Sequence, residues 1–294
     1  MDLTAPADTA RLDRKAVAAA TIAVLLWASA FVGIRTAAAH FGPGPLALGR
    51  LAVGSVALLA TWAVRREPLP PRAAWPGIAV SGLLWFALYM VALNWGEQKV
   101  DAGTAAMVVN LGPVLIALLG GLLLREGFPR QLMIAVAVSF TGAVVVGLSR
   151  AGGSSSLLGV LLCLLAALLY AAGVVAQKPA LRHAGALQVT AFGCLLGTVA
   201  CLPFSGQLVS QLAHAPLSAT LDLVYLGLFP TALAFSAWAY ALSRTTAGRM
   251  GATTYAVPAL VVLMSWAILG EVPALLSLVG GGLCLTGVAL SRRR

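Results

Sequence analysis

Charged residues are scarce in this chain of 294 residues: they make up 10% of it, and only nine are acidic. The chain has three histidines and four cysteines, and no CxxC pair. The acidic residues and histidines all fall in tails, loops or the ends of apolar runs. A hydrolase inside a membrane needs a base or metal ligands at depth. We therefore expect no enzyme, no metal site and no cofactor.

Long apolar runs are what the chain has in abundance, since 60% of its residues are hydrophobic, far more than in an average soluble domain. Ten runs approach the roughly 20 residues that a helix needs to cross a bilayer. They cover about residues 16–38, 45–64, 73–95, 101–124, 129–148, 157–177, 186–204, 218–242, 247–269 and 274–290. A barrel would instead alternate polar and apolar residues. We predict an all-α integral membrane protein with ten transmembrane helices.

The chain also repeats itself after about 145 residues. The elements that recur with the same internal spacing are Pro113, Glu126 and Thr141-Gly142, which return as Pro258, Glu271 and Thr286-Gly287. This repetition predicts a tail at 1–15 and five-helix repeats at 16–150 and 151–294. Because five is odd, the second repeat must enter the membrane from the opposite side, which gives inverted repeats around a central cavity.

The basic residues predict the orientation. With the N-terminus inside, fifteen of the nineteen Lys and Arg residues fall on the cytoplasmic side, and only Arg35, Arg50, Lys99 and Arg150 are left for the other face. This asymmetry indicates a multi-pass protein of the cytoplasmic (inner) membrane with both termini in the cytoplasm. The net charge of +10 then reflects topology, and we expect no nucleic-acid partner. The apolar N-terminal run imitates a signal peptide, but its removal would leave four helices against five, so we expect it to be retained.

Each repeat has the same layout: a proline, then an acid just past the fourth span, and then a Gly-rich fifth span. This layout resembles that of the EamA family of the drug/metabolite transporter superfamily. The resemblance covers essentially the whole chain and rests on residues 27–31, 113–126 and 258–271. Arg125 stands where the family usually has glycine before the acid, whereas Gly270 keeps that pattern. The resemblance implies a ten-helix carrier that exports small metabolites, most like the amino-acid exporters of the YddG type.

Polar and aromatic side chains within the spans are the candidates for binding a solute. The substrate-binding candidates are Trp27, Trp85, Tyr89, Asn110, Tyr170 and Tyr255. Asn110 stands out, because an amide at that depth needs a partner or water, although it could simply bond a neighbouring helix. For the aromatic residues, packing within the protein or contact with lipid is the alternative to solute binding. Pro113 and Pro258, at mid-helix, are candidate hinges, and a fixed kink is the alternative.

We therefore predict a carrier that exports small metabolites, with amino acids, aromatic ones included, as the leading class, by alternating access. Its partners are a small-molecule substrate and the lipid bilayer. The expected cavity is uncharged, polar and aromatic, and the lack of a mid-membrane carboxylate favours transport down the substrate gradient over proton coupling. A pore-like channel and a membrane-embedded enzyme are the alternatives.

Two further features concern assembly and helix ends. Small residues recur every four positions at Ala135, Ser139, Ala143 and Gly147, a face that suits close packing within the chain or between copies. Monomer and homodimer both stay open. Glu126 and Glu271 lie at span ends, where pairing with arginine or capping of a neighbouring helix is expected.

Overall fold

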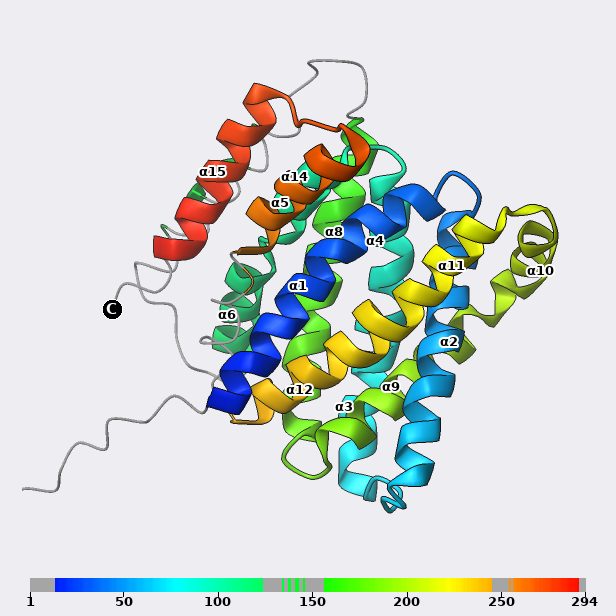
Figure 1. The fold of residues 1–294 in the computed structure, drawn as a ribbon. Coiled ribbons are helices and arrows are strands. Elements are labelled where there is room, and N and C mark those ends of the chain that lie inside the picture. Colours follow the sequence, from blue (N-terminus) through cyan, green and yellow to red (C-terminus); the bar gives the residue numbers. More distant parts are fainter. Residues whose placement is uncertain are drawn as a thin grey trace, which may run out of the picture.

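The computed structural model describes residues 14–123, 156–244, 254 and 256–290, together with six isolated positions between 134 and 145. Over these residues it is a bundle of helices without strands (Figure 1). The helices are α1 (Arg14–Ala37), α2 (Pro43–Val64), α3 (Trp75–Ser81), α4 (Tyr89–Glu97), α5 (Ala102–Val109), α6 (Gly112–Leu123), α8 (Leu157–Ala180), α9 (Ala186–Cys201), α10 (Ser205–His214), α11 (Leu217–Leu226), α12 (Ala234–Arg244), α14 (Ala256–Leu269) and α15 (Leu275–Leu290). Two π-helical segments, η2 (Gly82–Leu88) and η4 (Gly227–Leu233), and the 3₁₀ turns Arg72–Ala74 and Leu202–Phe204 complete them.

Within the residues that the structure describes, seven helical stretches are long and apolar enough to cross a membrane, which confirms the all-helical membrane class. They are Arg14–Ala37, Pro43–Val64, Arg72–Glu97, Ala102–Gly120, Leu157–Ala180, Ala186–His214 and Leu217–Arg244. The helices α14 and α15 are shorter, with 14 and 16 residues. The predicted fifth span, 129–148, lies mostly outside the described residues, as do Arg125, Glu126, the small-residue face and Tyr255. The number of ten spans therefore stays a prediction.

Helical elements recur along the chain at the spacing of the sequence repeat. Both α1 and α8 contain 24 residues, and α8 begins 143 residues after α1. The π-helical segment η2 recurs 145 residues later as η4, with the same length. Since π-helices are rare and mostly occur as single turns within α-helices, their recurrence at this spacing indicates that the two halves share local structure as well as a residue pattern.

The helices α1 and α8 run in opposite directions through the bundle (Figure 1). Near the end of α1, Arg35 Nη1 donates a hydrogen bond of 2.9 Å to the carbonyl oxygen of Glu97, the last residue of α4. The backbone nitrogen of Ser156, just before α8, donates a bond of 3.1 Å to the carbonyl oxygen of Lys99. The end of α1 and the start of α8 therefore lie at the same end of the bundle.

Glycines allow α2 and α9 to approach the π-helical segments closely. A Cβ at Gly54 in α2 would lie 2.9 Å from Cγ2 of Thr231 in η4, and a Cβ at Gly197 in α9 would lie 2.6 Å from Cβ of Phe86 in η2. Each would also lie 3.1 or 3.2 Å from the carbonyl oxygen of the first residue of that segment. The two glycines are 143 residues apart and the two segments 145 apart, so the same contact is made twice.

The fourth predicted span is interrupted where α5 ends and α6 begins. Asn110 and Leu111 form a turn between the two helices, and Asp101 caps the start of α5 by accepting a 2.8 Å bond from the backbone nitrogen of Thr104. Pro113 is the second residue of α6, and Pro258 is the third of α14. The expected mid-helix position is therefore wrong for both: they lie in a first turn, where a missing N–H has no intrahelical acceptor to lose. Their hinge role stays a prediction.

We expect Gly54→Leu to destabilise the protein by about 1–3 kcal/mol, because the larger side chain overpacks the contact of α2 with η4. The measurement is thermal unfolding of purified protein in detergent. Gly206→Leu is the matched control, since a Cβ at Gly206 meets nothing within 4 Å. Equal melting temperatures for the two variants would contradict the close packing.

A candidate substrate cavity

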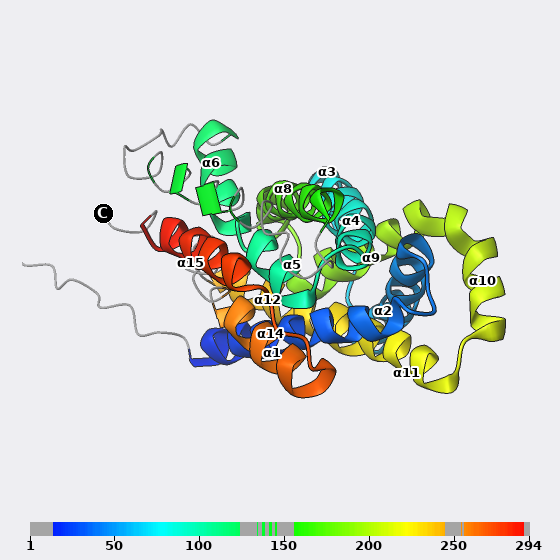
Figure 2. The ribbon, with the colours of Figure 1, turned by 90° about the horizontal axis from the view of Figure 1, so that it is seen from above.

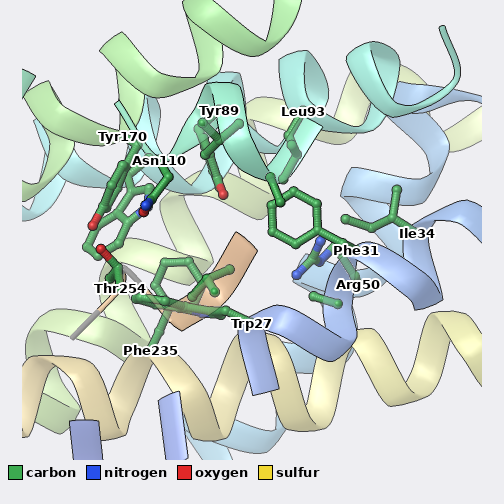
Figure 3. Close-up of a pocket in the computed structure, with 15 residues that line it drawn as sticks. Trp27, Phe31, Ile34, Arg50, Tyr89, Leu93, Asn110, Tyr170, Phe235 and Thr254 are labelled. Atoms are coloured by element: carbon green, nitrogen blue, oxygen red, sulfur yellow. The ribbon is translucent and has the colours of Figure 1, made fainter. Parts of the chain in front are cut away.

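Inside the helix bundle, which Figure 2 shows from above, a cavity of about 60 Å³ is bounded by residues of α1, α2, η2, α4, α5, α8, α12 and α14 (Figure 3). Both halves of the chain contribute to its walls. A space of this size has room for a few water molecules, and a bulky solute needs more. Binding such a solute would therefore require the surrounding helices to separate.

The structure brings five of the six predicted binding residues together in the walls of this cavity. They are Trp27, Trp85, Tyr89, Asn110 and Tyr170. The sixth, Tyr255, lies outside the described residues, but its neighbour Thr254 lines the cavity. The side chain of Asn110 is buried, and its Nδ2 has no hydrogen-bond partner among the described residues. The turn between α5 and α6 places this amide at the cavity, where a solute could bond it.

An aromatic cluster forms one side of the cavity. The ring of Trp27 lies 6.2 Å from that of Trp85 and 5.4 Å from that of Phe235, both edge to face. Trp85 in turn lies 5.3 Å from Tyr170 and 4.8 Å from Phe235. Edge-to-face and tilted contacts at these distances are favourable, and the rings that line the cavity can pack against an apolar or aromatic solute.

Several lining residues are absent from the sequence-based set. Phe31 follows Trp27 by four residues on α1 and lines the same cavity, as the helical period requires. Phe235 on α12 lines the cavity as well, but no residue of α12 belongs to the sequence-based set, so helical periodicity could not point to it. Thr254 carried no signal of its own beyond its place next to Tyr255.

Arg50 corrects the expectation of an uncharged cavity. It is the eighth residue of α2, about 10 Å along the helix from Pro43, and it is only 3% exposed. Its side chain lines the cavity, and its Nε donates a hydrogen bond of 3.2 Å to Oγ1 of Thr231. An ionisable residue inside an apolar run is itself a signal of a functional site. The sequence reasoning counted Arg50 among the charges of the outer face and so missed it.

One end of the bundle is held by an ion pair. Arg35 Nε lies 2.7 Å from Oε1 of Glu271, which confirms the expected pairing of that acid with arginine. Together with the bond from Arg35 to the carbonyl oxygen of Glu97, this contact joins the end of α1 to the end of α4 and to the segment after α14. It thereby links the two halves of the chain at that end.

Comparison with known proteins shows a match to the EamA-like transporter family over residues 14–148 and again over 157–293. The chain is 38% identical to the "Probable terminal-alkyne amino-acid exporter" of Streptantibioticus cattleyicolor, over 95% of this chain and 94% of that one. It is 36% identical to the "Uncharacterized transporter YdfC" of Bacillus subtilis, over 90% of this chain and 87% of that protein. A crystal structure with 22% identity aligns with a TM-score of 0.65, over 95% of this chain and 96% of that one, and shows the same fold.

Asn110→Leu should leave thermal stability unchanged or slightly raised, because it removes a buried Nδ2 that makes no hydrogen bond. Asn94→Leu is the matched contrast: Asn94 is equally buried, but its Nδ2 donates a 3.1 Å bond to the carbonyl oxygen of Pro43. We expect that variant to lose about 0.5–1.5 kcal/mol. Thermal unfolding of both proteins measures the difference, and a larger loss for Asn110→Leu would show that its amide is a structural element.

Proposed function

Since the chain belongs to the EamA-like transporter family, we propose that it is a carrier that exports amino acids, aromatic ones included, by alternating access. The observation that carries this proposal is the cavity between the two halves, with aromatic rings on one side and unbonded polar groups in its wall. Such a site suits a small solute with an apolar body and a polar end. The 38% identical relative named as an amino-acid exporter supports the same class.

Alternating access needs two halves that can exchange conformations around a fixed site. The opposite directions of α1 and α8 support an inverted arrangement of the repeats. The small volume of the cavity, about 60 Å³, supports a cycle in which the helices separate to admit a solute. Opening the end closed by Arg35 and Glu271 would break their ion pair. Pro113 and Pro258, each in the first turn of a helix beside the cavity, are the proposed hinges.

The membrane orientation belongs to the same proposal: a cytoplasmic membrane protein with both termini inside. It predicts that His183, between α8 and α9, faces the cytoplasm and that His214, at the end of α10, faces outward. Both side chains are exposed. In a background with the native cysteines replaced, an impermeant maleimide should label His214→Cys in intact cells and His183→Cys only after permeabilisation. The reverse pattern would invert the orientation, and labelling of both in intact cells would rule out the topology.

Transport itself is tested by counterflow in liposomes that contain the purified protein. Labelled phenylalanine or leucine should enter faster when the same unlabelled amino acid is inside, and the rate should saturate. A pore would show neither property. An imposed pH step should cause no accumulation of label; accumulation that an uncoupler abolishes would replace the gradient-driven mechanism by proton coupling.

Asn110→Leu should raise the half-saturating concentration of this transport a few-fold to about tenfold, as expected for one lost hydrogen bond to the solute. Arg65→Gln, at the exposed end of α2, is the control and should transport as the unaltered protein does. An unchanged half-saturating concentration in Asn110→Leu would remove this amide from the binding site.

A further inference from the structure

We propose that Arg50 binds the carboxylate of the transported solute, so that the cavity selects molecules in which a carboxylate is joined to an apolar or aromatic body. This inference rests on the proposed transport of amino acids and names the group by which the site recognises them. Three features of the molecule support it: the bonding of the guanidinium, its support in η4 and the difference between the two halves of the chain.

The guanidinium of Arg50 has donors to spare inside the bundle. Its Nε bonds Thr231, whereas the two terminal nitrogens make no hydrogen bond or ion pair with any described residue. Glu97 acts on Arg50 electrostatically, but no ion pair joins them. An arginine that served only to tie α2 to η4 would be expected to use more of its five N–H donors, because unbonded buried donors are costly.

The position of Arg50 suits a solute that spans the cavity. Figure 3 shows its guanidinium at one side of the cavity and Asn110, Tyr170 and Thr254 at the other, with the Tyr89 hydroxyl directed between them. A carboxylate bound at Arg50 would leave the rest of the solute beside the aromatic rings. The planar fork of terminal nitrogens matches the two oxygens of a carboxylate.

Thr231 holds this fork in place. The Thr231 hydroxyl accepts the bond from Arg50 Nε and itself donates a 2.8 Å bond to the carbonyl oxygen of Leu226, five residues earlier. Thr231 is fully buried within η4. With Nε bonded to this buried hydroxyl, the two terminal nitrogens are left oriented for a ligand, which lowers the entropy cost of binding.

The second half of the chain makes the corresponding packing without a charge. The residue 143 positions after Arg50 is Gly193 in α9, and a Cβ there would lie 3.3 Å from the ring of Phe86 in η2. Phe86 is the counterpart of Thr231, 145 residues earlier. The shared packing of helix on π-helical segment therefore does not require an arginine. The charge is a feature of one side of the cavity, as recognition of one end of a solute requires.

The test compares solutes that differ only at their ends, in counterflow with labelled phenylalanine. Unlabelled phenylalanine and 3-phenylpropionate, which keep the carboxylate, should compete. Phenylalaninamide, in which a neutral amide replaces the carboxylate, should compete at least about tenfold less well. Equal competition by the amide and the free amino acid would overturn the proposal, whatever any variant does.

Arg50→Gln should raise the half-saturating concentration for phenylalanine by about 10- to 100-fold and abolish the discrimination against the amide. Arg50→Lys keeps the charge but lacks the planar pair of terminal nitrogens. Compared with Arg50→Gln, it should recover part of the affinity for phenylalanine and part of the discrimination against the amide. Arg65→Gln should match the unaltered protein. Discrimination that persists in Arg50→Gln contradicts the proposal, and if that variant fails to fold, Arg50→Lys and the solute panel decide.

A binding measurement distinguishes failure of the carboxylate site from failure of the proposed transport. Trp27 and Trp85 line the cavity, so their fluorescence reports a bound solute without any transport. Binding of 3-phenylpropionate but not of 2-phenylethylamine, lost in Arg50→Gln, would uphold the carboxylate site even if no amino acid crosses the membrane. Binding of both solutes with similar affinity, or of neither, would overturn it.

Discussion

The close contact of α2 with η4, and of α9 with η2, holds the two halves of the chain together, and the cavity between them depends on it. Inside a bilayer, helices gain little from the hydrophobic effect, because lipid tails are as apolar as leucine, so association relies on close packing and hydrogen bonds. Gly54 and Gly197 lack the Cβ atoms that would keep these helices apart. The walls that carry Arg50 and Trp85 are positioned by these same contacts.

The π-helical segments have a second effect, on the direction of the side chains near them. A π turn holds one extra residue and shifts the helical phase of everything beyond it. Tyr89 directly follows η2, and Phe235 comes two residues after η4; both line the cavity. The same local irregularity that packs against α2 and α9 thus also orients part of the cavity wall.

Some polar side chains of the interior join helices, and others line the cavity. Asn94 and Ser55 bond other protein groups and join helices, Ser55 through a 2.8 Å contact with Thr198. Around the cavity, Asn110 Nδ2 and Trp27 Nε1 have no partner among the described residues. Leaving such groups unbonded costs free energy of folding, and a bound solute can recover it. Both of these unbonded nitrogens therefore belong to residues that line the proposed site.

The sequence by itself determined the membrane class, the family and most of the candidate site. Crossing a bilayer imposes an apolar run of set length whatever the packing, and Trp27, Trp85, Tyr89, Asn110 and Tyr170 were recognisable as residues poorly suited to lipid. Only the tertiary structure decided that Arg50 points into the cavity, that Asn110 ends α5 at a turn and that Phe235 joins the aromatic wall. Whether a side chain meets lipid, a neighbouring helix or a cavity depends on how helices far apart in the chain cross, and local periodicity does not contain that information.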